Sequence, residues 1–274
     1  MPSNFRQRAR DALQRARTEL ASGSNERTTY AALELRMAIE CVTYERAKAY
    51  EKEFPPREYD VWQPTKLMKE LLELDPHADA SATLSFGLED EPGVPPKEMK
   101  TLGSESVFSM KDIKSSYDAL GSFLHQPTLK QISNGGDHNW QKLHARCEEL
   151  IVKLEAVLAS PVFNLNFGVF TTFQCMNDDC GKSVRKRLPQ GKSEVAAVCF
   201  ECGAEHVITV DPKGLDMVRP VVQDVPCAKA GCKNKIQLFK HELKEGASWK
   251  CHECGTQCLI GLSVFEAPSP QSKN

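Results

Sequence analysis

The sequence predicts an α+β protein, in which an N-terminal α-helical bundle is followed by two small tandem units built from β-hairpins. Two observations support this fold class. Between residues 3 and 160, apolar side chains recur at the three- and four-residue spacing of amphipathic helices. After residue 173, one cysteine pattern occurs twice, and a repeat of this kind indicates a duplicated structural unit.

Two helices are expected at the N-terminus, at about residues 3–21 and 26–53, with the helix-breaking stretch 22–25 between them. The second is expected to end before Pro55 and Pro56, because proline disfavours helical geometry in the residue before it. Four apolar residues about one turn apart are expected to form the buried stripe of this second helix: Leu33, Met37, Cys41 and Tyr44.

A third helix is expected to begin near Pro64, since proline suits the first helical turn. An irregular insertion rich in glycine and proline then follows at residues 80–110. Within it, two short strands are expected at 83–86 and 107–108. The helical bundle with its insertion is thus expected to cover residues 1–160.

The last two helices are expected at about 110–125 and 137–159. Trp62 and Trp140 are expected to pack into the helical core, because each can bury a large apolar surface. A linker strand is expected at 161–172, leading from the bundle into the first cysteine repeat.

Eight of the 11 cysteines fall into two sets with the same spacing, C-x4-C, then eighteen residues, then C-x2-C. Each cysteine of the second set follows its counterpart by 52 residues. Four thiolates at such spacing are typical of a tetrahedral zinc site. The expected zinc ligands are Cys175, Cys180, Cys199 and Cys202 in the first set, and Cys227, Cys232, Cys251 and Cys254 in the second.

The two sets therefore predict tandem β-hairpin zinc ribbons at residues 173–212 and 225–265, each holding one structural Zn²⁺ ion. Turn residues predict a hairpin between the two cysteine pairs of each ribbon, at 189–192 and at 245–246. Four thiolate ligands leave no open position for a catalytic water, so both ions are expected to be structural. Residues 266–274 are expected to form a disordered tail.

Two alternatives to this ligand assignment remain open. The cysteines could form a disulfide framework, although residues 1–6 show no apolar signal-peptide region and the CxxC spacing favours metal in a non-secreted chain. Cys258 and His252 lie beside the second set and could replace one of its ligands.

The net charge of −2 gives no general attraction to nucleic acid, and no apolar run approaches the length of a membrane span. A soluble, cytoplasmic protein without a membrane partner is expected. Locally, Arg185, Lys186 and Arg187 are candidate nucleic-acid contacts, because strand alternation places the two arginines on one face. Phe170 or Phe173 could stack on bases beside them. The alternative is that these charges only keep a small hairpin soluble.

Two segments of the helical region resemble a known family. Residues 35–41, with Leu35, Arg36 and Glu40, look like the LR-x-x-x-E helix of HEPN-type domains. Residues 116–125 resemble the late helix of that family, which ends in a histidine, here His125. The resemblance implies a helical bundle that is often dimeric, so a homodimer through the helical domain is expected. It also implies a prokaryotic defence system, and many members are ribonucleases with an Arg-x4-6-His motif.

This sequence departs from that catalytic motif. An arginine four to six residues before His125 would occupy position 118, 119 or 120, where Asp118, Ala119 and Leu120 stand. Arg36 is the remaining candidate for the cation that a phosphate-cleaving site requires. P-loop, dinucleotide-binding, GxSxG and HExxH motifs are absent from the sequence.

The sequence therefore favours a non-enzymatic, zinc-binding recognition or adaptor protein that binds nucleic acid or a protein partner through its ribbons. A role in a prokaryotic defence or regulatory system is expected. Two alternatives remain: a HEPN-type ribonuclease whose ribbons position RNA, and a structural subunit of an assembly.

Overall fold

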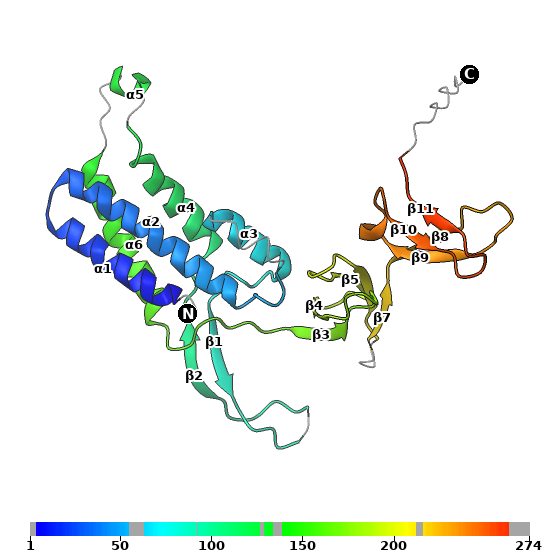
Figure 1. Cartoon of the computed structure of the whole chain (residues 1–274). Coiled ribbons are helices and arrows are strands. Elements are labelled where there is room, and N and C mark those ends of the chain that lie inside the picture. Colours follow the sequence, from blue (N-terminus) through cyan, green and yellow to red (C-terminus); the bar gives the residue numbers. More distant parts are fainter. Residues whose placement is uncertain are drawn as a thin grey trace, which may run out of the picture. The chain divides into compact units, whose positions relative to one another are not determined.

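The computed structural model divides the chain into two compact units, residues 1–167 and 168–274. The first unit is helical and the second consists of small antiparallel hairpins that carry the cysteine sets, so the predicted α+β fold class is confirmed (Figure 1). The residues described by the structure are 4–54, 63–91, 93–126, 129–133, 139–211 and 216–262. Trp62 and the expected tail at 266–274 lie outside them.

The helical unit is organised around α2, which packs against α1, α3, α4 and α6 (Figure 1). The side chains of Asn4, Ser109 and Asn139 cap α1, α4 and α6 by accepting a backbone N–H of the first turn. The helices are α1 (Phe5–Ala21), α2 (Asn25–Lys48), α3 (Pro64–Leu74), α4 (Met110–Ser122), α5 (Leu129–Ser133) and α6 (Trp140–Ala159).

The buried face of α2 differs from the predicted one. Leu33 and Met37 are 44% and 43% exposed, and Cys41 and Tyr44 are only partly buried. Small side chains form most of the buried face because they let α1 approach closely, whereas the prediction followed the larger apolar residues. The fully buried apolar residues of α2 are Ala31, Ala32, Leu35, Ala38 and Ile39.

The insertion forms an antiparallel hairpin of β1 (Ala82–Phe86) and β2 (Lys100–Glu105). The first strand was predicted correctly, but the prediction of a strand at 107–108 was wrong. Phe108 is buried in the helical core instead, and the strand that pairs with β1 lies closer to the glycine- and proline-rich loop. None of the described helices combines the length and apolar composition that a membrane span requires.

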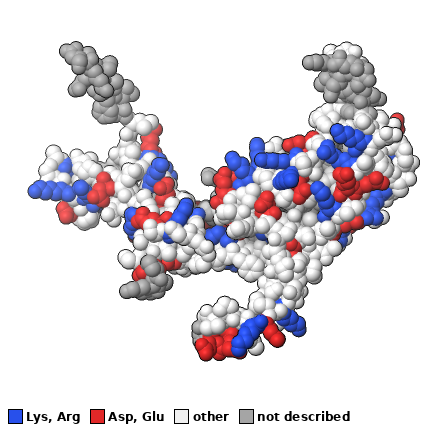
Figure 2. Space-filling model, turned by 180° about the vertical axis from the view of Figure 1, so that it is seen from behind, with Lys and Arg blue, Asp and Glu red and all other residues white. Residues whose placement is uncertain are grey.

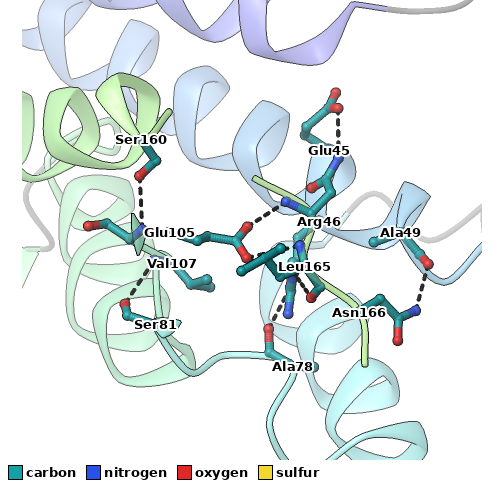
Figure 3. Close-up of polar contacts among 12 residues, drawn as sticks. Glu45, Arg46, Ala49, Ala78, Ser81, Glu105, Val107, Ser160, Leu165 and Asn166 are labelled. Atoms are coloured by element: carbon teal, nitrogen blue, oxygen red, sulfur yellow. Dashed lines mark hydrogen bonds and ion pairs between the residues drawn. The ribbon is translucent and has the colours of Figure 1, made fainter. Parts of the chain in front are cut away.

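Arg46 of α2 and Glu105 of β2 form a buried ion pair, with 3.5 Å between the guanidinium nitrogen and the carboxylate oxygen (Figure 3). This pair joins α2 to the β1-β2 hairpin. The Glu105 carboxylate accepts the backbone N–H groups of Asn164 (2.6 Å) and Leu165 (3.0 Å). Arg46 donates to the carbonyls of Leu165 (2.8 Å) and Ala78 (2.7 Å). These bonds satisfy both charges away from water, and they fix the chain against α2 until just before the second unit begins.

The second unit contains two ribbons, called here the first ribbon (β3–β7) and the second ribbon (β8–β11). The first has a two-stranded sheet, β3-β4, and a three-stranded sheet, β5-β6-β7; the second has two two-stranded sheets, β8-β9 and β10-β11. The strands are β3 (Val169–Gln174), β4 (Ser183–Leu188), β5 (Glu194–Val198), β6 (Glu205–Thr209), β7 (Met217–Pro220), β8 (Val222–Pro226), β9 (Lys235–Phe239), β10 (Ser248–Lys250) and β11 (Gln257–Leu259).

The hairpins lie elsewhere than the turn residues predict. The turn at 189–192 exists, but it connects β4 to β5, which belong to different sheets. In each ribbon, one cysteine pair closes the first hairpin and the other pair closes the second. Strand register repeats with the 52-residue period, since Phe170 pairs with Arg187 and Val222 pairs with Phe239. The duplication therefore extends from the cysteines to the strand pairing.

Candidate metal centres and nucleic-acid interface

The structure brings the eight predicted cysteines together in two groups of four. Within each group, all four sulfur atoms lie within 4.8 Å of one another. In the first group, the Sγ–Sγ distance is 3.7 Å for Cys175 and Cys202 and 3.8 Å for Cys180 and Cys199. In the second group it is 3.6 Å for Cys227 and Cys254 and 3.9 Å for Cys232 and Cys251.

The backbone of each second cysteine pair forms a tight turn that directs both sulfurs inward. In the first ribbon, Gly203 N–H donates to the Cys199 carbonyl (2.8 Å), and in the second, Gly255 N–H donates to the Cys251 carbonyl (2.9 Å). Both glycines have positive φ, 83° and 71°. A side chain is strained in this region, so glycine after the last cysteine allows the turn.

Hydrogen-bond donors surround the sulfurs of the second group. The Asn234 amide donates to Cys251 Sγ (3.3 Å), and the backbone N–H of Lys229 donates to Cys227 Sγ (3.5 Å). The hydroxyl and backbone of Thr256 lower the pKa of Cys254 to about 6. The Lys229 N–H lowers the pKa of Cys227, but desolvation and hydrogen bonds with the other three sulfurs outweigh it and raise that pKa to about 12. Hydrogen bonds from N–H and O–H donors favour the thiolate, which is the form that binds metal.

All 11 cysteines are free thiols in the structure, and no disulfide joins any pair. The S–S separations within the two groups are well above the covalent bond length of about 2.0 Å. The arrangement therefore corresponds to the metal assignment and differs from the disulfide alternative.

Sequence reasoning missed His206, which stands 52 residues before Cys258. The ring is 0% exposed, and its Nε2 accepts the backbone N–H of Met176 (3.1 Å) and lies 3.9 Å from Cys175 Sγ. Burial lowers the pKa of His206, which favours the neutral imidazole. Pairing Cys258 with the residue 52 positions earlier would have revealed this histidine.

The two residues that could replace a ligand in the second set lie in different places. Cys258 is 2% exposed, and its sulfur lies 3.9 Å from Cys227 Sγ. His252 is exposed, and its Nδ1 lies 3.4 Å from the Asn234 amide. Of the two, Cys258 is the one that contacts a predicted ligand.

The two ribbons contact each other through Phe239 and the 3-10 turn Lys240–Glu242 that follows it. Phe239 belongs to the hydrophobic core of the first ribbon, with its ring centroid 5.8 Å from that of His206. The Asn177 side-chain amide, in the first cysteine pair of the first ribbon, donates to Glu242 (3.2 Å). The second ribbon therefore completes the core of the first.

The cationic face predicted on the first ribbon includes an aromatic ring. The ring of Phe170 contacts two guanidinium groups, with Arg185 4.0 Å and Arg187 4.7 Å from the ring centroid. Strand register places these three side chains on one face, and alternation places Lys186 on the other. Phe173 packs against His206 instead, so Phe170 is the aromatic residue beside the cations.

Two further facts characterise this face, which we call the Phe170 face (Phe170, Arg185 and Arg187). Within the part of the chain that the structure describes, the buried Nε of Arg185 has no hydrogen-bond partner. Basic and acidic side chains are interspersed over the surface displayed in Figure 2, in keeping with the net charge of −2. Any attraction for phosphate is therefore local rather than general.

The ribonuclease candidates lie on or near α4. The Arg36 guanidinium stacks 4.0 Å from the ring centroid of Tyr117, whose hydroxyl donates to Glu40 (2.6 Å). A side chain at Gly121 would collide with Arg36. His125 is exposed and follows the end of α4. The two segments that resemble HEPN-type domains thus contact each other through Arg36, Glu40 and Tyr117.

No protein-family model, characterised protein or solved structure matches this chain. The resemblance to HEPN-type domains therefore gains no support from these comparisons. The function has to be inferred from the cysteine groups and the Phe170 face.

Proposed function

We propose that the protein is a non-enzymatic recognition module whose two structural zinc ions order a surface that binds single-stranded nucleic acid. The observation that carries the proposal is the Phe170 face, where one aromatic ring contacts two guanidinium groups. The face is built on the strands that enter and leave a cysteine pair, so metal binding and recognition are linked by the β3-β4 hairpin.

The cysteine geometry supports zinc. A tetrahedral ion with Zn–S bonds of about 2.3 Å places its sulfurs about 3.8 Å apart. Two sulfur pairs in each group, at 3.6–3.9 Å, agree with this value. Four thiolates also fill all four positions of a tetrahedral ion and leave none for a reacting water, which supports a structural role.

The small size of the ribbons gives the zinc its importance. Among its described residues, the second ribbon buries only Phe239, Cys251 and Cys258. Such a unit cannot offset its loss of conformational entropy by burying apolar surface. Zinc binding contributes on the order of 10 kcal/mol in comparable peptides, which is enough to order a ribbon.

The chemistry of the Phe170 face suits a flexible strand of nucleotides. A base can stack on an aromatic side chain for about 1–3 kcal/mol, and arginine can contact the adjacent phosphates.

The internal repeat supplies independent support. The positions of Phe170 and Arg187 in the first ribbon correspond to Val222 and Phe239 in the second. In the second ribbon Val222 and Phe239 pack on the first ribbon, while Gln237, which corresponds to Arg185, is exposed. The same strand face is thus a contact surface in the second ribbon, and in the first it carries cations suited to a charged ligand.

The test is fluorescence anisotropy with a labelled single-stranded oligonucleotide and the full chain. We expect Arg185→Ala combined with Arg187→Ala to weaken binding by about tenfold or more, because both cations and the alignment of Phe170 are lost. Lys240→Ala combined with Lys244→Ala is the matched control, since it removes the same charge from the exposed surface of the second ribbon. Zinc content should be unchanged in both variants.

Equal weakening by both double variants would show that binding depends on charge alone. Unchanged affinity in the Arg185/Arg187 variant would contradict the proposal. Tighter binding of duplex than of single strands would also contradict it, because paired bases cannot stack on Phe170.

A second candidate function is a HEPN-type ribonuclease, favoured by the contact of Arg36 with Tyr117 on the helix that leads to His125. It requires a histidine that transfers a proton and a cation at the scissile phosphate. We expect no cleavage of single-stranded RNA in a chelator-containing buffer. Cleavage that disappears on His125→Ala would favour this candidate over the recognition module.

A further inference from the structure

Each ribbon carries a fifth side chain of metal-ligand type at the same position of the 52-residue repeat. In the first ribbon it is His206 and in the second it is Cys258, and both are almost completely buried. Each lies 3.9 Å from the first cysteine of its group, Cys175 or Cys227. Imidazole nitrogen and thiolate sulfur are both common zinc ligands, so each of these residues is of a type that could bind the metal of its centre.

The two residues are engaged differently. The Nε2 of His206, which faces Cys175, accepts the backbone N–H of Met176, so its lone pair is directed to the backbone. Its ring is also packed between Phe173 and Phe239. Rotation of this ring towards a metal would break that hydrogen bond and disturb the core of the first ribbon.

Cys258 has no such constraint. It lies on β11 opposite Trp249 of β10. Among the described residues, its thiol makes only long hydrogen-bonding contacts, to Cys227 Sγ and to the Thr256 carbonyl, both at 3.9 Å. It is not one of the four cysteines whose sulfurs all lie within 4.8 Å of one another. Cys258 therefore lies next to one ligand of the group, Cys227, and outside the group of four.

We propose that Cys258 is a reserve ligand of the second metal centre, which replaces Cys227 when the bond from Cys227 to the metal opens. The inference rests on zinc binding by the two cysteine groups, as proposed above. It gives the second centre two sets of four thiolates that share Cys232, Cys251 and Cys254.

The exchange balances without a redox partner. The bond between the metal and Cys227 Sγ breaks, and a bond between the metal and Cys258 Sγ forms. The thiol proton of Cys258 passes to the sulfur of Cys227, which is its neighbour at 3.9 Å. The charge of the centre is unchanged, and no oxidant is consumed.

The second ribbon has more need of such a reserve than the first. Its described residues bury few side chains, so metal loss would remove most of what orders it. The first ribbon retains an apolar core that includes Val184, Val195 and Ile208. A histidine held in place suits the first ribbon, whereas an exchangeable thiol suits the second.

Zinc content of the full chain, measured by elemental analysis, tests the proposal. We expect Cys227→Ser to retain two zinc ions per chain, because Cys258 completes the second set. The matched control Cys232→Ser should retain one, since its sulfur has no such neighbour among the described residues. Cys227→Ser combined with Cys258→Ser should also retain one. A single ion in the Cys227→Ser variant would overturn the proposal.

A second measurement leaves the four ligands intact. Cys258→Ser should retain two zinc ions but lose one of them to a colorimetric chelator about tenfold faster than the unaltered chain. Cys41→Ser, a change in the helical unit, is the control. An unaltered release rate in Cys258→Ser would overturn the reserve role. Fewer than two zinc ions in the unaltered chain would instead contradict the zinc assignment itself.

Discussion

The two ribbons have the same cysteine spacing and the same strand register, yet they differ in what holds them together. The first buries a cluster that includes Val184, Ala197, His206 and Ile208. The second buries two cysteines of its own, and its one buried phenylalanine packs on the first ribbon. The comparison teaches that four sulfur positions can determine a backbone while the remaining side chains diverge in role.

The two ribbons differ most clearly at the positions that form the Phe170 face in the first ribbon. The equivalent positions in the second ribbon include Val222 and Phe239, which bury apolar surface against the first. One copy of the repeat therefore uses this face for assembly of the tandem, and we propose that the other uses it for recognition.

The largest expected effect is that of zinc removal, to which the ribbons and the helical unit should respond differently. A strong chelator should destabilise both ribbons, because about 10 kcal/mol of metal binding per site is lost, and it should unfold the second ribbon more completely than the first, which has an apolar core. The helical unit has its own apolar core without a metal ligand, so its helical circular dichroism should persist. Loss of the helical signal together with the ribbon signals in NMR spectra would contradict this independence.

A matched pair of substitutions measures the difference between the two ribbon cores. Ile208 and Ile260 are 52 residues apart, but Ile208 is fully buried and Ile260 only half-buried. Ile208→Ala should lower the free energy of unfolding of the zinc-loaded ribbons by about 2–5 kcal/mol. Ile260→Ala should cost about 1 kcal/mol. Equal costs in denaturant titrations would show that the two ribbons depend equally on apolar burial.

A smaller effect concerns the salt dependence of nucleic-acid binding. If Arg185 and Arg187 each neutralise one phosphate, the logarithm of affinity should fall with the logarithm of salt concentration with a slope of about −1.4. The slope should approach zero in the double alanine variant. A steep slope that persists in this variant would locate the binding surface elsewhere on the molecule.

The smallest expected effect is the dependence of the helical unit's stability on the protonation of Asp112. Burial alone would raise the pKa of Asp112, but hydrogen bonds from Ser109 and Lys153 outweigh it and lower the pKa. The carboxylate therefore stabilises the fold at neutral pH, and this contribution is lost as the pH falls from the unfolded-state pKa through the lowered folded-state pKa. Asp112→Asn should cost about 1 kcal/mol at pH 7.

Urea titrations at several pH values, after zinc removal, would check this sign. The difference in free energy of unfolding between the unaltered chain and the Asp112→Asn variant should shrink as the solution is acidified. A difference that stays constant with pH would indicate that the asparagine changes packing rather than charge.

The cysteine spacing was sufficient to predict both groups of four, because ligand spacing reflects the local geometry of the metal site. The strand pairing was not, since the turn at 189–192 looks the same whether its flanking strands pair with each other or with different partners. The strand predicted at 107–108 failed for the same reason, because β2 is defined by its pairing with β1.

Burial was hardest to predict where small residues or the repeat determined it. The alanines of α2 form its buried face, although Leu33 and Met37 are more apolar, because helix spacing depends on side-chain size. His206 was missed because the prediction considered Cys258 as a possible replacement ligand without pairing it with the residue 52 positions earlier.

X-ray absorption at the zinc edge of the purified full chain, together with its zinc content, tests the central claim most directly. The account predicts two zinc ions per chain, each surrounded by four sulfurs at about 2.3 Å. Fewer than two ions, or nitrogen or oxygen atoms in the first coordination shell, would contradict it.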